Sequence, residues 1–127
     1  MDRGSVLLRV DAIGEVALGL TLVTSPVTGL SAQLQLPRPA TERRAAAFGA
    51  GLLPFGGLLW WAARRATRPV LASVAAVNLA TAAVLSGWFS VRRTEMNAAA
   101  ATLTLGTAAG LAALAAAEAS AVRSTSA

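Results

Sequence analysis

The sequence predicts an all-α protein: a four-span transmembrane up-and-down helix bundle, with residues 1–127 forming a single domain. Composition is the first reason, because 55% of the residues are hydrophobic, only 13% are charged and the mean hydropathy is +0.60, as in membrane proteins. The second reason is the pattern. The charged residues fall in short clusters that separate apolar stretches of about 20 residues, the length of a helix that crosses a bilayer.

The first span is predicted at residues 5–24, an apolar stretch interrupted by three charged side chains: Arg9, Asp11 and Glu15. Because such charges break the apolar core of a cleavable signal peptide, we expect this helix to remain in the mature protein. The helix is expected to end near Pro26, where proline removes a helical hydrogen bond. The uncharged residues 27–36 then form either a short interfacial or re-entrant segment or a continuation of the first helix beyond a bend at this proline.

The other spans are predicted at residues 45–63, 69–91 and 96–117. Thr41 followed by an acid is typical of a helix start, and Pro69 is tolerated in a first helical turn. The loops between these spans are too short for anything but antiparallel neighbours. With alternating sides, six arginines fall at one end of the bundle and five at the other, so the positive-inside rule predicts no orientation.

The residue types exclude several function classes. Without Cys or His, the chain has no thiolate or imidazole for a metal site, haem ligation, a disulfide or a nucleophile, and we expect no metal and no cofactor. The net charge of +5 comes from arginines in clusters between the apolar stretches, whereas nucleic-acid binding requires them along one face. We interpret the arginines as anchors to lipid headgroups and expect no nucleic-acid partner.

Asp11 and Glu15 are the candidate catalytic residues. They are four positions apart, so on a helix they share one face, and an acid at membrane depth costs at least ~2.5 kcal/mol unless it points into the bundle. Desolvation and mutual repulsion both disfavour the charged forms, so the pair could donate and recover protons. In the alternative interpretation, Asp11 lies at the interface and pairs with an arginine of a neighbouring helix, while Glu15 satisfies polar side chains. Arg9 points to the opposite side of its helix and is not the simple partner.

Polar and aromatic residues on the other spans are candidates for substrate binding. Asn78, Thr81 and Trp88 share one face of the third span, Asn97 begins the fourth, and Trp60 closes the second. If these faces converge on the acids, they form a polar floor and an aromatic wall of an apolar chamber, and tryptophan faces attract cations. The alternative is that the amides and hydroxyls only join helices by hydrogen bonds, and that Trp60 belongs to an aromatic belt.

In its compact membrane bundle, acids on the spans and aromatic walls, the chain resembles the small membrane-bound terpene cyclases of bacterial meroterpenoid and indole-terpenoid pathways. The resemblance implies a lyase or isomerase in which Asp11 or Glu15 protonates an alkene or epoxide of a polyprenyl substrate and the other acid takes the final proton. Trp88 and Trp60 would stabilise the carbocations. The stretch Leu7-Leu8-Arg9-Val10-Asp11-Ala12 also resembles one in many four-span actinobacterial proteins, which implies a multi-pass protein of a bacterial cell membrane.

Two alternatives remain. The length, the four spans, the balanced arginines and the first-span acid in Ala12-Ile13-Gly14-Glu15-Val16 are similar to the small multidrug resistance family, whose members are proton-coupled exporters. That family uses a tyrosine near its substrate, whereas this chain has none, and Asp11 is an acid that the family lacks. The last alternative is a scaffold without chemistry. In each case the expected partners are membrane lipid and, for the first two, a lipophilic small molecule, with a homo-oligomer as a further possibility.

Overall fold

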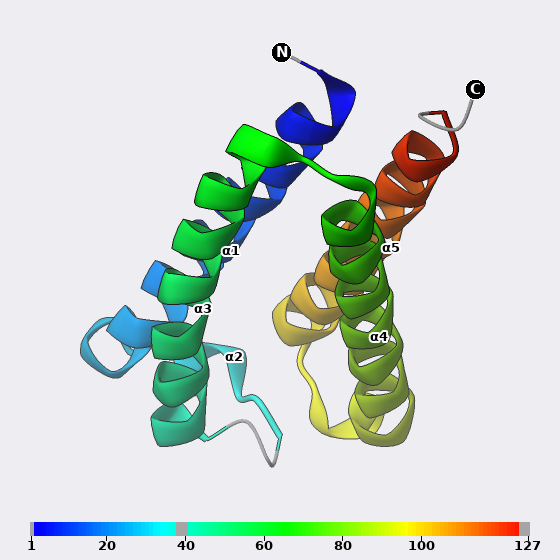
Figure 1. Cartoon of the computed structure of the whole chain (residues 1–127). Helices are drawn as coiled ribbons and strands as arrows, with labels where there is room; N and C mark the ends of the chain where they lie inside the picture. The colour runs from blue at the N-terminus through cyan, green and yellow to red at the C-terminus, as the bar shows by residue number, and fades with distance from the viewer. Residues whose placement is uncertain (1, 38–40, 125–127) are drawn as a thin grey trace.

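The computed structural model describes residues 2–37 and 41–124 (Figure 1). Within these ranges every regular element is helical, which confirms the all-α prediction. The elements in chain order are α1 (Arg3–Thr28), α2 (Leu30–Leu34), α3 (Glu42–Ala62), the 3-10 turn η1 (Ala63–Arg65), α4 (Arg68–Arg92), the 3-10 turn η2 (Arg93–Glu95) and α5 (Ala98–Ser124).

The four long helices run alternately in opposite directions and form two antiparallel pairs (Figure 1). Helix α1 packs along α3, and α4 packs along α5. The pairs meet where α1 also contacts α5, at the end of the molecule that carries both termini (Figure 1). The up-and-down order of the long helices is therefore the one that the short loops predicted.

The end of α1 differs from its prediction. The helix continues through Pro26 to Thr28 and stops at Gly29, whose φ of 67° lies in the left-handed region. A proline removes one backbone donor, which a long helix tolerates, whereas a left-handed residue ends the helical path. The short helix α2 follows and ends at Gln35, also left-handed with φ 48°. Both earlier interpretations of this segment are thus partly right: the first helix passes the proline, and a separate short helix follows it.

The starts of α3 and α4 agree with their sequence signals. Thr41 is the N-cap residue of α3, and Pro69 lies in the first turn of α4. Helix α5 starts after Asn97 and runs to Ser124, well beyond the predicted end at residue 117. Its last turns are rich in alanine, the residue with the highest helix propensity, and contain no glycine or proline. This extension places Glu118 inside the helix.

Glycines let α1 and α3 approach closely. A Cβ atom on Gly49 would lie 2.7 Å from the carbonyl oxygen of Gly19, and one on Gly56 would lie 2.7 Å from Cγ2 of Val16. Neither distance leaves room for a side chain, so the backbone of α3 lies directly against the backbone of α1 at Gly49 and against the Val16 side chain at Gly56. Small residues at such crossings are typical of helix packing in membranes.

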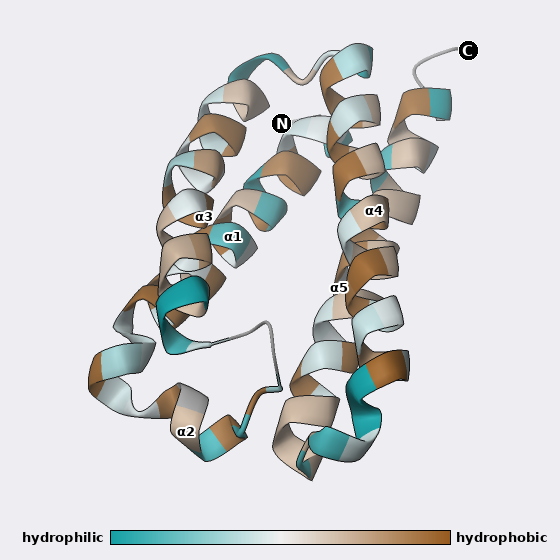
Figure 2. Ribbon diagram, turned by 90° about the horizontal axis from the view of Figure 1, so that it is seen from below, coloured by the Kyte–Doolittle hydropathy of each residue, from teal (hydrophilic) through white to brown (hydrophobic). Residues whose placement is uncertain are grey.

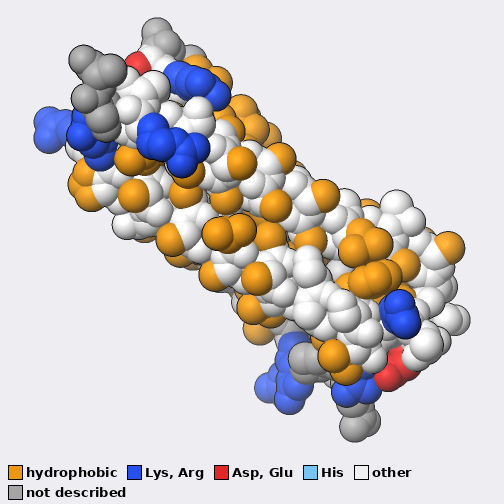
Figure 3. Space-filling view, turned by 90° about the vertical axis from the view of Figure 1, so that its right-hand side faces the viewer, with side chains coloured by type: hydrophobic (Ala, Val, Ile, Leu, Met, Phe, Trp, Pro, Cys, Tyr) orange, Lys and Arg blue, Asp and Glu red, His pale blue; other side chains and the backbone are white. Residues whose placement is uncertain are grey.

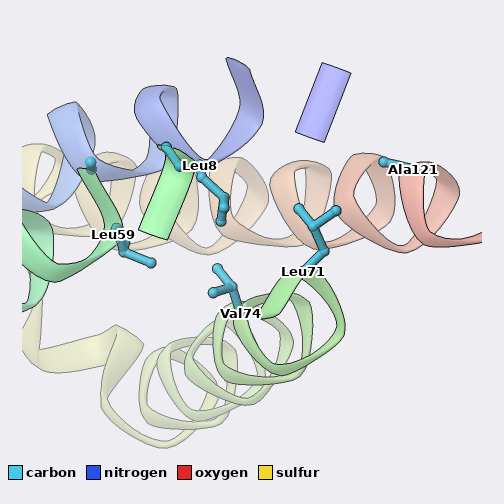
Figure 4. Packing of buried hydrophobic residues seen from close by; sticks show 7 residues of the cluster. Leu8, Leu59, Leu71, Val74 and Ala121 are labelled. Atoms are coloured by element: carbon cyan, nitrogen blue, oxygen red, sulfur yellow. The ribbon is translucent and has the colours of Figure 1, made fainter. Parts of the chain in front are cut away.

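A cluster of aliphatic side chains joins the two helix pairs. Leu8, Leu59, Leu71 and Val74 point toward one another, and Ala121 of α5 packs against the same cluster (Figure 4). These residues come from α1, α3, α4 and α5. The cluster therefore fixes all four long helices at the end of the molecule where the termini lie.

Between its two ends the outer surface is apolar. Large hydrophobic side chains stay exposed on every long helix, among them Val10, Leu58, Val84 and Leu103. Hydrophilic residues gather mainly at the helix ends and turns, with others inside the helices, as in the first half of α1 (Figure 2). On the face shown in Figure 3, the basic side chains lie at the two ends and hydrophobic side chains cover the part between them.

Three helical stretches of the described chain are long and apolar enough to cross a membrane: Glu42–Arg65, Arg68–Glu95 and Ala98–Ser124. They contain the second and third predicted spans and all of the fourth except its first two residues. Helix α1, which carries Arg9, Asp11 and Glu15, is not among them. The structure thus has five α-helices in the described residues, four of them long, where the sequence predicted four spans.

Candidate functional site

A hydrogen-bonded cluster joins the two helix pairs below the aliphatic cluster. The Nδ2 atom of Asn78 on α4 donates to Oδ2 of Asp11 on α1 at 3.0 Å and to Oε2 of Glu118 on α5 at 3.2 Å. Both donor positions of the amide are thereby used, and the two carboxyl oxygens lie within about 6 Å of each other because they share one nitrogen. These three residues are named the carboxyl–amide cluster.

All three members of the carboxyl–amide cluster are buried. Asp11 is 2%, Asn78 1% and Glu118 0% exposed. At a rise of 1.5 Å per residue, they lie roughly 9–15 Å from the nearest ends of their helices at one end of the molecule. Each of the three is buried because it lies on the inner face of its helix. Asn78, for instance, is four residues from both Val74 and Ala82, which are also buried, so all three lie on the inner face of α4.

The acids around the cluster lack basic partners. Within the described residues, none of Asp11, Glu15 and Glu118 forms a salt bridge; the ion pair found there joins Arg92 and Glu95 at 2.8 Å on the surface. Oε1 of Glu118 and Oε2 of Glu15 are buried without a hydrogen-bond partner. An unpaired buried carboxylate costs several kcal/mol, so this arrangement requires bound protons or a cation for neutrality.

The structure brings two of the predicted site residues together and leaves two others near them. Asp11 and Asn78 bond directly. Glu15 lies one helical turn from Asp11, half-buried. The hydroxyl of Thr81 donates to the carbonyl oxygen of Val77 at 2.9 Å, so it is engaged within its own helix and does not join two helices, as the alternative interpretation of such residues expected it to. Trp88, half-buried, lies roughly 15 Å along α4 from the amide.

Trp60 and Asn97 lie away from the acids, and the prediction that they line the same chamber is wrong. Trp60 is exposed on the outer side of the α1–α3 pair, with its ring centroid 5.1 Å from the guanidinium carbon of Arg9. Asn97 caps the start of α5, accepting from the backbone N–H of Ala100 at 2.9 Å, and donates to the carbonyl oxygen of Gln33 at 3.0 Å. It lies about 30 Å along α5 from the carboxyl–amide cluster. A polar face on each of several helices does not imply that these faces pack against one another.

Glu118 is the site residue that the sequence reasoning missed. The predicted fourth span ended at residue 117, immediately before this acid. A signal was present, because Thr104, Ala108 and Ala115 precede it at intervals that repeat the helical period and form the buried stripe of α5. Continuing that stripe by one step reaches Glu118. An acid on the buried face of a helix is a functional candidate even when it lies just beyond the predicted end of the span.

The chemistry available to the carboxyl–amide cluster is the binding and release of protons and cations. Within the described residues, no group of three His, Cys, Asp or Glu side chains is arranged to hold a metal ion. No family model matches the chain, and neither a curated protein nor a solved structure does.

Proposed function

We propose that the chain is a four-span integral membrane protein in which the carboxyl–amide cluster exchanges protons for a lipophilic cation, and that this exchange drives export of the cation. The supporting observation is that Asn78 bridges two buried acids from different helices, neither of which forms a salt bridge within the described part of the chain. Such a site needs a positively charged occupant. A proton and an organic cation can compete for it.

Helix α1 is proposed as the fourth span. Its 26 residues extend over about 39 Å, longer than the hydrocarbon thickness of a bilayer. Its outer surface exposes large apolar side chains, including Val6, Ile13 and Leu20, whereas its acids turn toward the other helices. The orientation of Asp11 removes it from lipid, which is how membrane proteins accommodate acids within a span.

The exchange step follows from the two carboxyl groups. When the cluster is empty of other cations, a proton on Glu118 or Asp11 removes one negative charge, and the amide of Asn78 holds the remaining carboxylate. An arriving organic cation replaces that charge, and the proton leaves the carboxyl oxygen for water. Charge in the site is conserved in both states, so release on one side and rebinding on the other couples the two movements.

The experiment is transport by the purified full-length chain in liposomes loaded at acidic pH and diluted into a more alkaline buffer. We expect uptake of tetraphenylphosphonium above that of empty liposomes, together with proton release reported by a pH-sensitive dye. Glu118→Gln and Asp11→Asn, which keep shape but remove the acid, should reduce both signals to the level of empty liposomes. Glu42→Gln changes an exposed acid at the start of α3 and should transport as the wild type does. Equal transport by Glu118→Gln and wild type would refute the proposal.

Acid-initiated cyclisation of a prenyl substrate is the second candidate. The observation that favours it is the pair of carboxyl oxygens within about 6 Å on one amide. One carboxylic acid would add its proton to an alkene carbon, the carbocation would form a carbon–carbon bond, and the other carboxylate would remove a proton from the adjacent carbon. Trp60 contacts Arg9 on the side of α1 opposite to Asp11, and Asn97 lies about 30 Å along α5 from the cluster, so neither contributes. Incubating the same liposomes with a polyprenyl epoxide and searching for an isomeric cyclic product distinguishes this candidate from export.

A further inference from the structure

An apolar groove runs along the outer side of the α1–α3 pair, opposite to the side of α1 that carries Asp11. Its walls include Ile13, Val16 and Leu20 from α1 and Gly56, Gly57 and Trp60 from α3. The carboxyl–amide cluster does not take part in it. The groove is thus a feature of the surface that the proposed proton exchange does not use.

Two adjacent glycines open the groove. Gly56 is buried in the helix contact, since a Cβ there would meet Val16, whereas a Cβ on Gly57 would have nothing within 4 Å. Gly57 therefore leaves open space on the groove side of α3. The packing of α1 against α3 does not require this space. Trp60, one turn further along α3, closes the groove toward the end of the molecule that carries Arg64 and Arg65.

A positively charged side chain, that of Arg9, lies at the end of the groove formed by Trp60. Arg9 precedes Ile13, Val16 and Leu20 at intervals of four, seven and eleven residues, so it lies on the same face of α1 as the groove wall. Its guanidinium carbon lies 5.1 Å from the centroid of the Trp60 ring. Its Nε atom is buried without a hydrogen-bond partner, and within the described residues no carboxylate forms a salt bridge with it.

We infer that this groove binds an anionic phospholipid. The phosphate diester accepts hydrogen bonds from the guanidinium of Arg9, and one acyl chain lies along Ile13, Val16 and Leu20 over the space left by Gly57. Charge complementarity identifies this occupant, because the groove is apolar along its length and cationic only at the end held against Trp60. The inference requires that the chain lie in a bilayer, but it is independent of proton exchange.

The test is lipid binding to the purified full-length chain in detergent, measured by native mass spectrometry with phosphatidylglycerol and phosphatidylcholine. The wild type should bind phosphatidylglycerol about fivefold more tightly, the factor expected for one arginine near an anionic headgroup. Arg9→Gln should remove this preference, whereas Arg64→Gln, a matched change of an exposed arginine at the same end, should retain it. Equal effects of the two variants would show general surface attraction and overturn the inference.

A second pair of matched variants tests whether an acyl chain occupies the groove. Gly57→Leu fills the groove and should weaken binding of both lipids at least fivefold, whereas Gly51→Leu, at another open and exposed position of α3, should bind both as the wild type does. Loss in both variants, or in neither, would overturn the groove assignment. Glycerol phosphate, which has the anionic group without the chains, should not displace phosphatidylglycerol. Full displacement would show a site for a free phosphate group and overturn the assignment of a lipid.

Discussion

Removing the bridging amide is the perturbation that most directly tests the carboxyl–amide cluster. Asn78→Leu keeps a similar side-chain volume but deletes both hydrogen bonds, at 3.0 and 3.2 Å. Because Asp11 and Glu118 are almost fully buried, water cannot replace the lost donors. Side-chain hydrogen bonds in membrane proteins contribute about 0.6–1.7 kcal/mol each, so we expect the free energy of unfolding to fall by about 1–3 kcal/mol.

The assay is reversible unfolding of the purified chain in mixed micelles of mild detergent and dodecyl sulfate, followed by far-UV circular dichroism. Thr81→Val is the matched control, since its hydroxyl donates only to the carbonyl oxygen one turn earlier in α4. In a background with Asp11→Leu and Glu118→Leu, Asn78→Leu should be neutral or stabilising, because no acceptors remain. An Asn78→Leu protein as stable as the wild type, or a loss no larger than that of Thr81→Val, would refute the reasoning.

The remaining predictions concern the helix contact and the first helix start. Gly56→Ala should destabilise the chain by about 1–3 kcal/mol in the same unfolding assay, because its Cβ would lie 2.7 Å from Cγ2 of Val16, whereas Gly57→Ala should change stability by less than about 0.5 kcal/mol at its open position. The backbone N–H and hydroxyl of Ser5 donate to Asp2 and lower the pKa of that carboxyl. Since the folded pKa lies below the unfolded one, the stabilisation by Asp2 is present above the unfolded pKa and lost as the pH falls through the folded pKa. An acid titration of unfolding should therefore show a smaller loss of stability for Asp2→Asn than for the wild type, and identical titrations would contradict this assignment.

The helices were predictable because hydrophobicity along the chain is local information. Apolar stretches of bilayer length separated by arginines indicate both the number of long helices and their alternating directions. The end of α1 was less predictable, since Pro26 is a strong helix breaker in general but removes only one backbone donor here. Gly29, not Pro26, ends the helix, and glycine by itself does not reveal whether φ is positive.

The candidate site was predictable only where a polar residue interrupts an apolar stretch. Asp11 and Asn78 stand out for that reason, and the structure joins them. Glu118 was missed because the charge itself was taken as the end of the span. The placement of Trp60 and Asn97 depends on which helix faces pack together, and the pairing of α1 with α3 rather than with α4 is non-local information that helical periodicity does not contain.

Helix α1 serves the two proposed sites through its opposite sides, and this explains why neighbouring opposite charges do not pair. Arg9 and Asp11 are two positions apart, about 200° around the helix, so Arg9 reaches Trp60 while Asp11 reaches Asn78. The guanidinium therefore leaves the inner acids without a counterion, which keeps their site open to a proton or cation. It follows that Arg9→Gln should alter lipid preference without affecting proton release in liposomes, and that Glu118→Gln should do the reverse. Coupled losses in either variant would mean that the two sides of α1 form one site.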